Sequence, residues 1–421
     1  MFKNEVAEFI YKRTYSRWME DEGRREEWPE TIERFIDFLI LKNGEKIPEK
    51  TVKKIRQYML DFAVMPSMRF LWSAGPAAEK DNTVIYNCSF AKLNCVEAFA
   101  ECLHVLMCGT GFGFSVEEDE VSKLPSIPEI KSGKDIARVT IDDSREGWAD
   151  SVKTLMTSLY EGQNIYFDYS QLRPEGARLS TMGGRSSGPQ PLIKLHDFIR
   201  ETMHNAQGRK LTSLECHDIA NQIAEIVVAG GVRRSSQISL SDLNDEDMRH
   251  AKDWPFPIRR AMANNSAIYR EKPTAADFLV EWGVLAKSGS GERGIFNLES
   301  AQNQAPARRY SSKIQGTNPC GEIMLRDMEF CNLSEVVVRE EDDLDSLLDK
   351  VETATWLGVL QSTFTNFPYL RKQWKKNCDV ERLLGVSLTG QMDNPLLMNS
   401  EALKALKSRV LRISRKASTA L

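Results

Sequence analysis

The stretch GTNPCGEIMLRDMEFCNLSEV, residues 316–336, decides how this chain is interpreted. Asn318, Cys320 and Glu322 alternate along it, with a proline and a glycine shaping the backbone between them. Alternate residues of an extended segment point to the same side, so an extended loop would aim an amide, a thiol and a carboxylate at one small volume. A second cysteine, Cys331, follows eleven residues after the first.

This set of side chains favours chemistry that uses a neutral thiol. A thiol beside a carboxylate is a poor anionic nucleophile, because the negative neighbour disfavours the thiolate. In hydrogen-atom chemistry, a sulfur radical takes hydrogen from carbon, a carboxylate removes a hydroxyl proton and an amide holds a neighbouring hydroxyl. Cys331 is then expected beside the same volume as a reductant. The alternative is that Cys320 and Cys331 are small buried hydrophobes, the usual fate of free cysteine.

The composition excludes several other classes of protein. The chain has 421 residues, 41% of them hydrophobic and 28% charged, and interspersed charges give a net charge of -4, so no basic stripe for nucleic acid is expected. The first thirty residues lack the apolar core of a secretory signal, and no apolar run reaches the length of a membrane span. The eight cysteines include no CxxC pair and are too sparse for a disulfide scaffold. These features predict a cytoplasmic protein with reduced thiols.

The hydrophobic pattern predicts an N-terminal helical region followed by an α/β body. Apolar residues at helical spacing indicate helices within residues 1–84, and the proline-bounded segment 66–76 is expected to be a loop. Residues 82–90 are interpreted as a strand and 96–107 as a helix. Strand signals then alternate with helices up to the quoted stretch, as in α/β proteins.

Cysteines of the segment 95–108 raise the question of a metal site. Cys95, Cys102 and Cys108, with His104, lack the paired spacing of a metal-binding motif. The interpretation preferred here is that they line the inner face of a helix, and no metal ligand is assigned.

Several segments resemble the motifs of ribonucleotide reductases. NPCGE followed by FCNL is similar to the finger loop of that family, and the short spacing resembles its adenosylcobalamin-dependent (class II) group. The other matching segments, in chain order, are RTYSRW (13–18), YNCSF (86–90), CGTGFGFSVE (108–117), GGRSSGPQPL (183–192), AGGVRRSSQISL (229–240) and LLGVSLTGQMDNPLL (383–397). RTYSRW in particular resembles the monomeric ribonucleoside-triphosphate reductases.

The resemblance implies a ten-stranded α/β barrel of the ribonucleotide reductase type. The expected parts are an N-terminal helical region (1–84), a first half-barrel with substrate and specificity loops (85–315), the finger loop (316–336) and the start of a second half-barrel (337–421). It further implies reduction of ribonucleotides, here triphosphates, to 2′-deoxyribonucleotides, with adenosylcobalamin as radical source and a thioredoxin-like reductant.

The same resemblance implies roles for the residues of the finger loop. Cys320 would form the thiyl radical that abstracts the ribose 3′-hydrogen, Glu322 would act as base at the 3′-hydroxyl, and Asn318 would hydrogen-bond the sugar hydroxyls. Cys88 and Cys331 would reduce the 2′ carbon and close to a disulfide.

Further residues are implied to contact nucleotides. Those expected near the substrate are Ser73, Gly111, Phe112 and Gly113. Two specificity loops, 173–192 and 230–237, are implied to connect a deoxynucleotide effector to the substrate base, through Arg173, Gly183, Gly184, Ser187, Arg233 and Arg234. For the two adjacent arginines, a solvated pair is the alternative.

Relatives of this family are longer, and the phosphate-binding loop and terminal cysteine pair of the family are not found in the sequence. We therefore expect the chain to be one piece of a split reductase, completed by a second chain that carries the C-terminal half-barrel. The alternative is a catalytically incomplete fragment that binds nucleotides and effectors without turnover.

Overall fold

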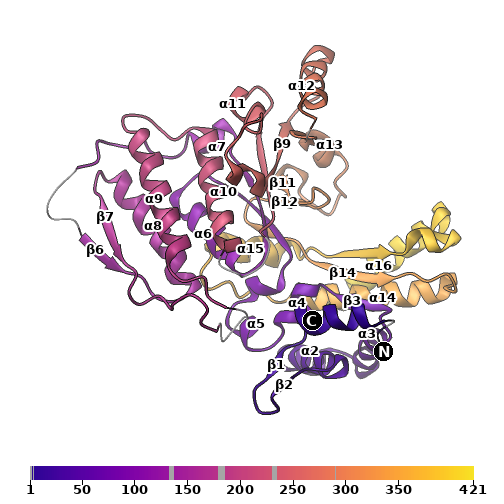
Figure 1. Ribbon diagram of the computed structural model, residues 1–421. Coiled ribbons are helices and arrows are strands. Elements are labelled where there is room, and N and C mark those ends of the chain that lie inside the picture. The colour runs from indigo at the N-terminus through magenta and orange to yellow at the C-terminus, as the bar shows by residue number, and fades with distance from the viewer. Residues whose placement is uncertain (1, 3, 132–136, 179–184, 230–234, 290) are drawn as a thin grey trace. The chain divides into compact units, whose positions relative to one another are not determined.

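A computed structural model describes the chain except for residues 1, 3, 132–136, 179–184, 230–234 and 290. The chain divides into two compact units, each built from segments that are distant in sequence (Figure 1). Unit 1 consists of Met1–Asn87, Phe330–Pro368 and Lys372–Leu421. Unit 2 consists of Cys88–Glu329 and Tyr369–Arg371. The four segments expected from the sequence stay predictions.

Unit 1 is mainly helical. Its helices are α1 (Glu5–Thr14), α2 (Trp28–Asn43), α3 (Glu49–Leu60), α4 (Met68–Ser73), α5 (Pro76–Lys80), α14 (Leu344–Gln361), α15 (Lys372–Glu381) and α16 (Ser400–Ala420). Its strands are β1 (Trp18–Met19), β2 (Arg24–Arg25), β3 (Val64–Pro66), β14 (Leu333–Val337) and β15 (Gly385–Thr389). Strand β14 pairs with β15 in parallel and with β3 antiparallel, so early and late parts of the chain share one small sheet.

Aromatic rings hold the helices of unit 1 together. Phe35 and Phe38 of α2 are buried and pack edge-on against Phe70 of α4. Phe364, which follows α14, stacks on Phe38 with ring centroids 5.2 Å apart. The N-terminal helices therefore share a core with a segment almost 300 residues later in the chain.

Two predictions of local structure within residues 66–90 are wrong. Residues 66–76 were expected to be a loop, but they contain α4, because Ser67 caps its N-terminus by accepting a hydrogen bond from the backbone of Phe70. The predicted strand at 82–90 is a strand only from Cys88 onward. Before it, Asn82–Ile85 form a 3-10 helix capped by Asp81, whose carboxylate accepts from the backbone of Thr83.

Unit 2 is an α/β unit built on a parallel sheet. Its helices are α6 (Val96–Met107), α7 (Glu118–Val121), α8 (Arg145–Tyr160), α9 (Gln190–Asn205), α10 (Ser213–Ala229), α11 (Glu246–Arg249), α12 (Ala275–Ser288) and α13 (Leu298–Asn303). Its strands are β4 (Cys88–Lys92), β5 (Gly111–Ser115), β6 (Ala137–Thr140), β7 (Ile165–Asp168), β8 (Gln237–Asp242), β9 (Ala263–Tyr269), β10 (Gly294–Asn297), β11 (Ile314–Thr317) and β12 (Met324–Arg326). The two-residue strand β13 (Glu329–Phe330) crosses the boundary between the units.

Five strands of this sheet are parallel and run in the order β10-β9-β8-β5-β4. Helix α6 begins and ends where the sequence predicted, and ten of its twelve residues are buried. Figure 1 shows α8, α9 and α10 side by side, with β6 and β7 beyond them. Because the strands are parallel, their N-terminal residues meet at one edge of the sheet.

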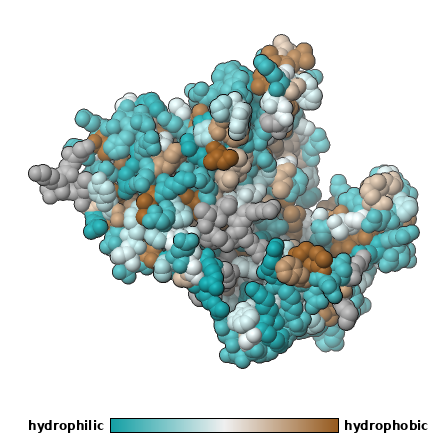
Figure 2. All heavy atoms as spheres, viewed as in Figure 1, coloured by the Kyte–Doolittle hydropathy of each residue, from teal (hydrophilic) through white to brown (hydrophobic). Residues whose placement is uncertain are grey.

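Helix α12 departs from the usual pattern, since its buried residue is a glutamate. Glu281 forms ion pairs with Arg293 and Arg249, whereas Phe278, Leu279, Val280 and Trp282 are exposed. Figure 2 shows hydrophobic surface at the position of α12, at the top of the view. An ion-pair network rather than an apolar face thus anchors this helix.

Candidate active site

The first part of the quoted stretch, with the two residues before it, forms a hairpin, which we call the finger hairpin (residues 314–326). Strands β11 and β12 pair antiparallel, from Thr317 opposite Met324 down to Ile314 opposite Arg326. At the tip, the backbone N–H of Gly321 donates to the carbonyl of Asn318 at 2.9 Å. Gly321 has a φ of 86°, a conformation that favours glycine. The tip is therefore a tight turn, and the extended loop expected from the alternating residues is wrong.

The two polar atoms of the Asn318 side chain differ in their hydrogen bonding. Its side-chain oxygen Oδ1 accepts a hydrogen bond from the backbone N–H of Ile323 at 2.9 Å, which closes the turn. Asn318 is fully buried, and its Nδ2 has no hydrogen-bond partner among the described residues. A buried amide donor without a partner is costly unless a ligand or water accepts from it. Asn318 is therefore suited to donate to a hydroxyl group of a ligand.

Cys320 and Glu322 are exposed at the tip of the finger hairpin. Partial burial raises the pKa of the Cys320 thiol above its ordinary value, and the nearby Cys88 thiol and Glu322 carboxylate raise it further. The thiol is thus protonated at neutral pH and accessible from outside. A neutral S–H in this setting is what hydrogen-atom chemistry requires.

Cys88 lies next to the finger hairpin at the start of β4. In the sheet, Cys88 is paired in register with Gly111 of β5. A Cβ atom built on Gly111 would lie 3.1 Å from Cγ of Pro319 and 3.4 Å from Sγ of Cys88. Gly111 therefore leaves the space in which the Cys88 sulfur and the tip of the hairpin come together.

A second glycine admits the backbone of the hairpin itself. A Cβ atom on Gly113 would lie 2.2 Å from the carbonyl oxygen of Thr317, a distance that no real side chain tolerates. Phe112, between the two glycines, points to the opposite face of the sheet because side chains alternate along a strand. Of the three residues predicted near the substrate in this strand, Gly111 and Gly113 thus share the face that carries Cys88.

Cys331 is fully buried and belongs to unit 1. Burial raises the pKa of the Tyr86 hydroxyl in the same unit, and the Cys378 and Cys331 thiols each raise this pKa further. Cys88 belongs to unit 2, so the pairing of Cys88 with Cys331 stays a prediction. Neither of these two cysteines is in a disulfide in the described structure.

The other predicted contact residues have hydrogen-bond or ion-pair partners of their own or lie outside the described residues. The Ser73 hydroxyl is buried in unit 1 and donates to the carbonyl of Arg69 within α4. In unit 2, Arg173 pairs with Asp143 at 2.6 Å, and the Ser187 hydroxyl donates to the carbonyl of Gly188. The calls outside the described residues are Gly183, Gly184, Arg233 and Arg234.

The described part of the segment predicted to be the first specificity loop is a short antiparallel ribbon. Residues 176–177 exchange backbone hydrogen bonds with Ser186, and Arg178 forms an antiparallel bridge to Arg185. The Arg185 guanidinium donates to the carbonyl of Gly176 at 2.8 Å. Residues 176–178 and residues 185–186 are thus joined by hydrogen bonds.

The three cysteines of segment 95–108 have separate neighbours. Cys95 accepts from the Arg371 guanidinium at 3.1 Å, and Cys102 from the side-chain amide of Gln237 at 3.6 Å. Cys108 accepts from Arg145 at 3.0 Å and lies 3.6 Å from His104. These thiols are therefore not gathered around one ion.

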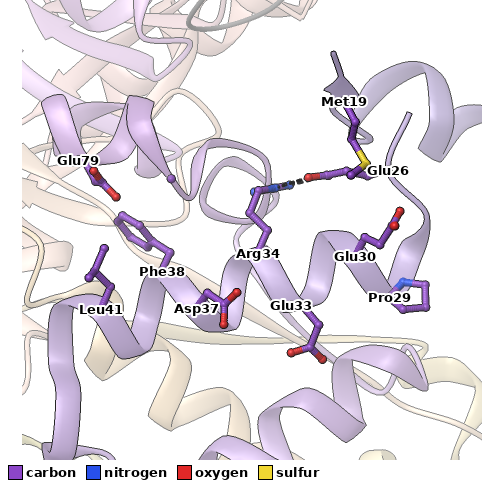
Figure 3. Close-up of a pocket in the computed structure, with 11 residues that line it drawn as sticks. Met19, Glu26, Pro29, Glu30, Glu33, Arg34, Asp37, Phe38, Leu41 and Glu79 are labelled. Atoms are coloured by element: carbon purple, nitrogen blue, oxygen red, sulfur yellow. Dashed lines mark hydrogen bonds and ion pairs between the residues drawn. The ribbon is translucent and has the colours of Figure 1, made fainter. Parts of the chain in front are cut away.

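A cavity of about 670 Å³ lies within unit 1, which the sequence did not predict (Figure 3). Its lining includes five carboxylates: Glu26, Glu30, Glu33, Asp37 and Glu79. Figure 3 shows Arg34 reaching Glu26, and the two are joined at 2.7 Å. Glu30 and Glu33 likewise pair with arginines, Arg24 and Arg56. Most of the acidic charge of this cavity is thus neutralised by the protein.

Sequence reasoning missed two residues that contact the finger hairpin. Asn264 of β9 places Nδ2 3.5 Å from the carbonyl oxygen of Pro319, at the tip. Lys92, the last residue of β4, contacts the other end of the hairpin. Neither belongs to a recognisable motif, and only the register of the sheet brings them to the hairpin.

Comparisons with known proteins agree with the resemblance to ribonucleotide reductases. Residues 1–76 match the model of the ribonucleotide reductase alpha domain. Residues 118–203 match the insertion domain of B12-dependent ribonucleotide reductase. Two separate segments of the chain are thus similar to ribonucleotide reductases, and the second is similar to the B12-dependent group in particular.

Relatives and solved structures agree with this assignment. The chain is 29% identical to the adenosylcobalamin-dependent ribonucleoside-triphosphate reductase of Levilactobacillus brevis, covering 97% of this chain and 63% of the relative. It is 29% identical to the enzyme of the same name from Lactobacillus gasseri, covering 92% and 62%. The chain thus spans less than two thirds of the length of these relatives.

The structure of a B12-dependent (class II) ribonucleotide reductase matches with a TM-score of 0.76 and 25% identity, over 91% of this chain and 62% of that chain. The class Id alpha subunit of Actinobacillus ureae, 12% identical, matches with a TM-score of 0.59 over 99% of this chain and 68% of that chain, which shows a shared fold. The prediction of an α/β fold of the ribonucleotide reductase type with an N-terminal helical region is confirmed.

Proposed function

We propose that the chain carries the radical-forming part of an adenosylcobalamin-dependent ribonucleoside-triphosphate reductase. The observation that supports this most is the meeting of Cys320, at the tip of the finger hairpin, with Cys88 on the glycine-lined face of the sheet. Named relatives over almost the whole chain are reductases of this kind.

In the proposed reaction, Cys320 loses a hydrogen atom and, as a thiyl radical, takes the 3′-hydrogen of the ribose. Glu322 accepts the proton of the 3′-hydroxyl, and Asn318 donates to a sugar hydroxyl through its unpartnered Nδ2. The 2′-hydroxyl leaves as water. Cys88 and Cys331 supply two electrons and two protons and close to a disulfide, after which Cys320 returns the hydrogen to the 3′ carbon.

Adenosylcobalamin would supply the carbon radical that removes the Cys320 hydrogen. The residue suits such a source, because its side chain is exposed and its raised pKa keeps the hydrogen on sulfur. Cys320 is the residue that would meet the cofactor.

The proposal includes partners that go beyond the named relatives. These are a deoxynucleotide effector at the specificity loops, a thioredoxin-like reductant and a second chain that supplies the rest of the family's fold. The chain spans 63% and 62% of the length of the two named relatives. Free thiols as electron donors require a reducing compartment, so the cytoplasm is the proposed location. Among the described helices, none is long and apolar enough to cross a membrane.

The test is cobalamin-dependent formation of deoxynucleotide from ribonucleoside triphosphates, with and without a polypeptide covering the remaining part of a relative. Cys320→Ser should abolish turnover while leaving thermal unfolding nearly unchanged, because the substitution is almost isosteric. Binding of deoxynucleotides without turnover in both mixtures would instead support the effector-binding fragment.

A further inference from the structure

Lys92, the last residue of β4, forms hydrogen bonds with one strand of the finger hairpin and with the residue that directly follows the other strand. Its ammonium group donates to the side-chain oxygen of Gln315 on β11 at 3.0 Å. Its backbone N–H donates to the carboxylate of Asp327, directly after β12, at 2.9 Å. Lys92 thus ties the two strands at the base of the hairpin to the end of β4.

A bulge in β11 places the Gln315 side chain in this contact. The pairing of β11 with β12 shifts in register between Ile314 and Gly316, so Gln315 is the extra residue. A bulge re-aims the side chain of the inserted residue, and here that side chain reaches Lys92.

From its base to its tip, the hairpin runs along β4 toward Cys88, the first residue of that strand. Gly316 lies on the ring of Phe90, and Pro319 lies beside Gly111, the register partner of Cys88. The base of the hairpin is therefore attached to the end of the strand that begins with Cys88. Because a strand is stiff, fixing the base fixes where the tip and its sulfur lie.

The lysine is held firmly enough to act as such an anchor. Its side chain is 12% exposed, and its ammonium group also pairs with Glu120 at 2.8 Å. Glu120 is itself buried and accepts from Asn94 and Lys123 through its other oxygen. A lysine buried in a network of this kind has little freedom to change its geometry.

We propose that Lys92 is a positioning residue that clamps the base of the finger hairpin and thereby sets the place of the Cys320 sulfur relative to Cys88. This inference rests on the proposed function only for its kinetic consequence. Lys92 touches neither substrate nor cofactor in this proposal, and it acts through the hairpin.

The variants Lys92→Met and Gln315→Met remove the clamp from its two sides. Lys123→Met is the matched control, because Lys123 pairs with the same Glu120 carboxylate and is bonded to no hairpin residue in the described structure. Lys92→Arg, which keeps a cationic donor, is the conservative variant. If Lys92→Met fails to fold, Gln315→Met, at a half-buried position, decides the question.

The first readout is alkylation of Cys320 by iodoacetamide, followed by peptide mass spectrometry over a range of pH in the full 421-residue chain. With the clamp removed, the Cys320 thiol moves away from Cys88, one of the neighbours that raise its pKa, so the pKa should fall and alkylation at pH 8 should accelerate about threefold. Lys123→Met and Lys92→Arg should match the unmodified chain. The double variant Lys92→Met/Gln315→Met should show no more than either single change, since both remove one contact.

The second readout is turnover with cobalamin and any polypeptide needed for activity. Loss of the clamp should lower kcat by roughly ten- to hundredfold with little change in KM, because misplacement of a reacting atom slows chemistry more than binding. Equal behaviour of Lys92→Met, Gln315→Met and Lys123→Met in both readouts would overturn the proposal. A shift in alkylation without turnover in any variant, the unmodified chain included, would reject the proposed function and leave the clamp standing.

Discussion

Gly316 lies against the ring of Phe90 so closely that a Cβ atom on Gly316 would come within 2.2 Å of the ring carbons. Phe90 is fully buried in β4, two residues after Cys88. The finger hairpin therefore rests on the strand that carries the predicted reductant cysteine, and the contact exists because position 316 has no side chain.

Replacing Gly316 with alanine should destabilise unit 2 and move the hairpin. The new methyl group overlaps the Phe90 ring, and such overpacking costs about 1–3 kcal/mol in the free energy of unfolding. Urea unfolding measures this change. Gly316→Ala combined with Phe90→Leu should recover part of the loss, whereas Gly283→Ala on α12, where a Cβ meets nothing within 4 Å, should cost nothing. Equal effects at Gly316 and Gly283 would contradict this account of the contact.

Glu322→Gln should lower the pKa of the Cys320 thiol. The Glu322 carboxylate is one of the neighbours that raise this pKa, after burial and Cys88, and an amide removes its negative charge. The midpoint of Cys320 alkylation should therefore move to lower pH, toward the ordinary cysteine value. Glu271→Gln, at an exposed position of the same unit, serves as control. An unchanged pH midpoint of alkylation would show that the Glu322 carboxylate does not influence the Cys320 thiol.

Substitution of Cys88 or Cys331 by serine should prevent multiple turnover. Cys320 can still form its radical, but one partner of the predicted disulfide is missing, so the two electrons that reduce the 2′ carbon cannot be delivered through that pair, even for the first substrate. Rapid-quench measurement of deoxynucleotide per enzyme distinguishes single from multiple turnover. Normal cycling of either variant with external thiols would show that the pairing of Cys88 with Cys331 is wrong.

Acid should destabilise unit 2 through two buried histidines. His196 is hydrogen-bonded to Ser151 and Tyr169, and burial lowers its pKa from 6.5 to about 3; burial also lowers the pKa of His217 to about 3. In the unfolded chain both bind protons near pH 6.5, so their contribution to stability is complete above that pH and is lost as the pH falls toward 3. Each should contribute a slope of about 1.4 kcal/mol per pH unit in this window.

His196→Gln should reduce that slope by the share of one histidine, as measured by urea unfolding at pH 4 to 7. His250→Gln, at an exposed position of the same unit, is the control for the exchange of a histidine for glutamine. An undiminished slope in His196→Gln would show that other groups cause the acid sensitivity.

Much of the secondary structure follows from local patterns in the sequence. Helix α6 occupies the predicted 96–107, because its apolar residues recur at helical spacing. The segment 66–76 was mispredicted, since its prolines and glycine suggested a loop while the Ser67 cap and buried Phe70 stabilise a helix. At the site, the residue types Asn318, Cys320 and Glu322 indicated the chemistry, but their alternation suggested an extended loop where a tight turn is found.

By itself, the sequence determined the chemical groups: a thiol that keeps its hydrogen beside a carboxylate, and further thiols in a chain without disulfide or CxxC patterns. Only the tertiary structure decided which groups meet. Cys88 and Pro319 come together over Gly111 because parallel strands align their first residues, and Lys92 reaches Gln315 because a bulge turns that side chain. Contacts between residues more than 200 positions apart depend on strand register and close packing, which no local pattern of residue types encodes.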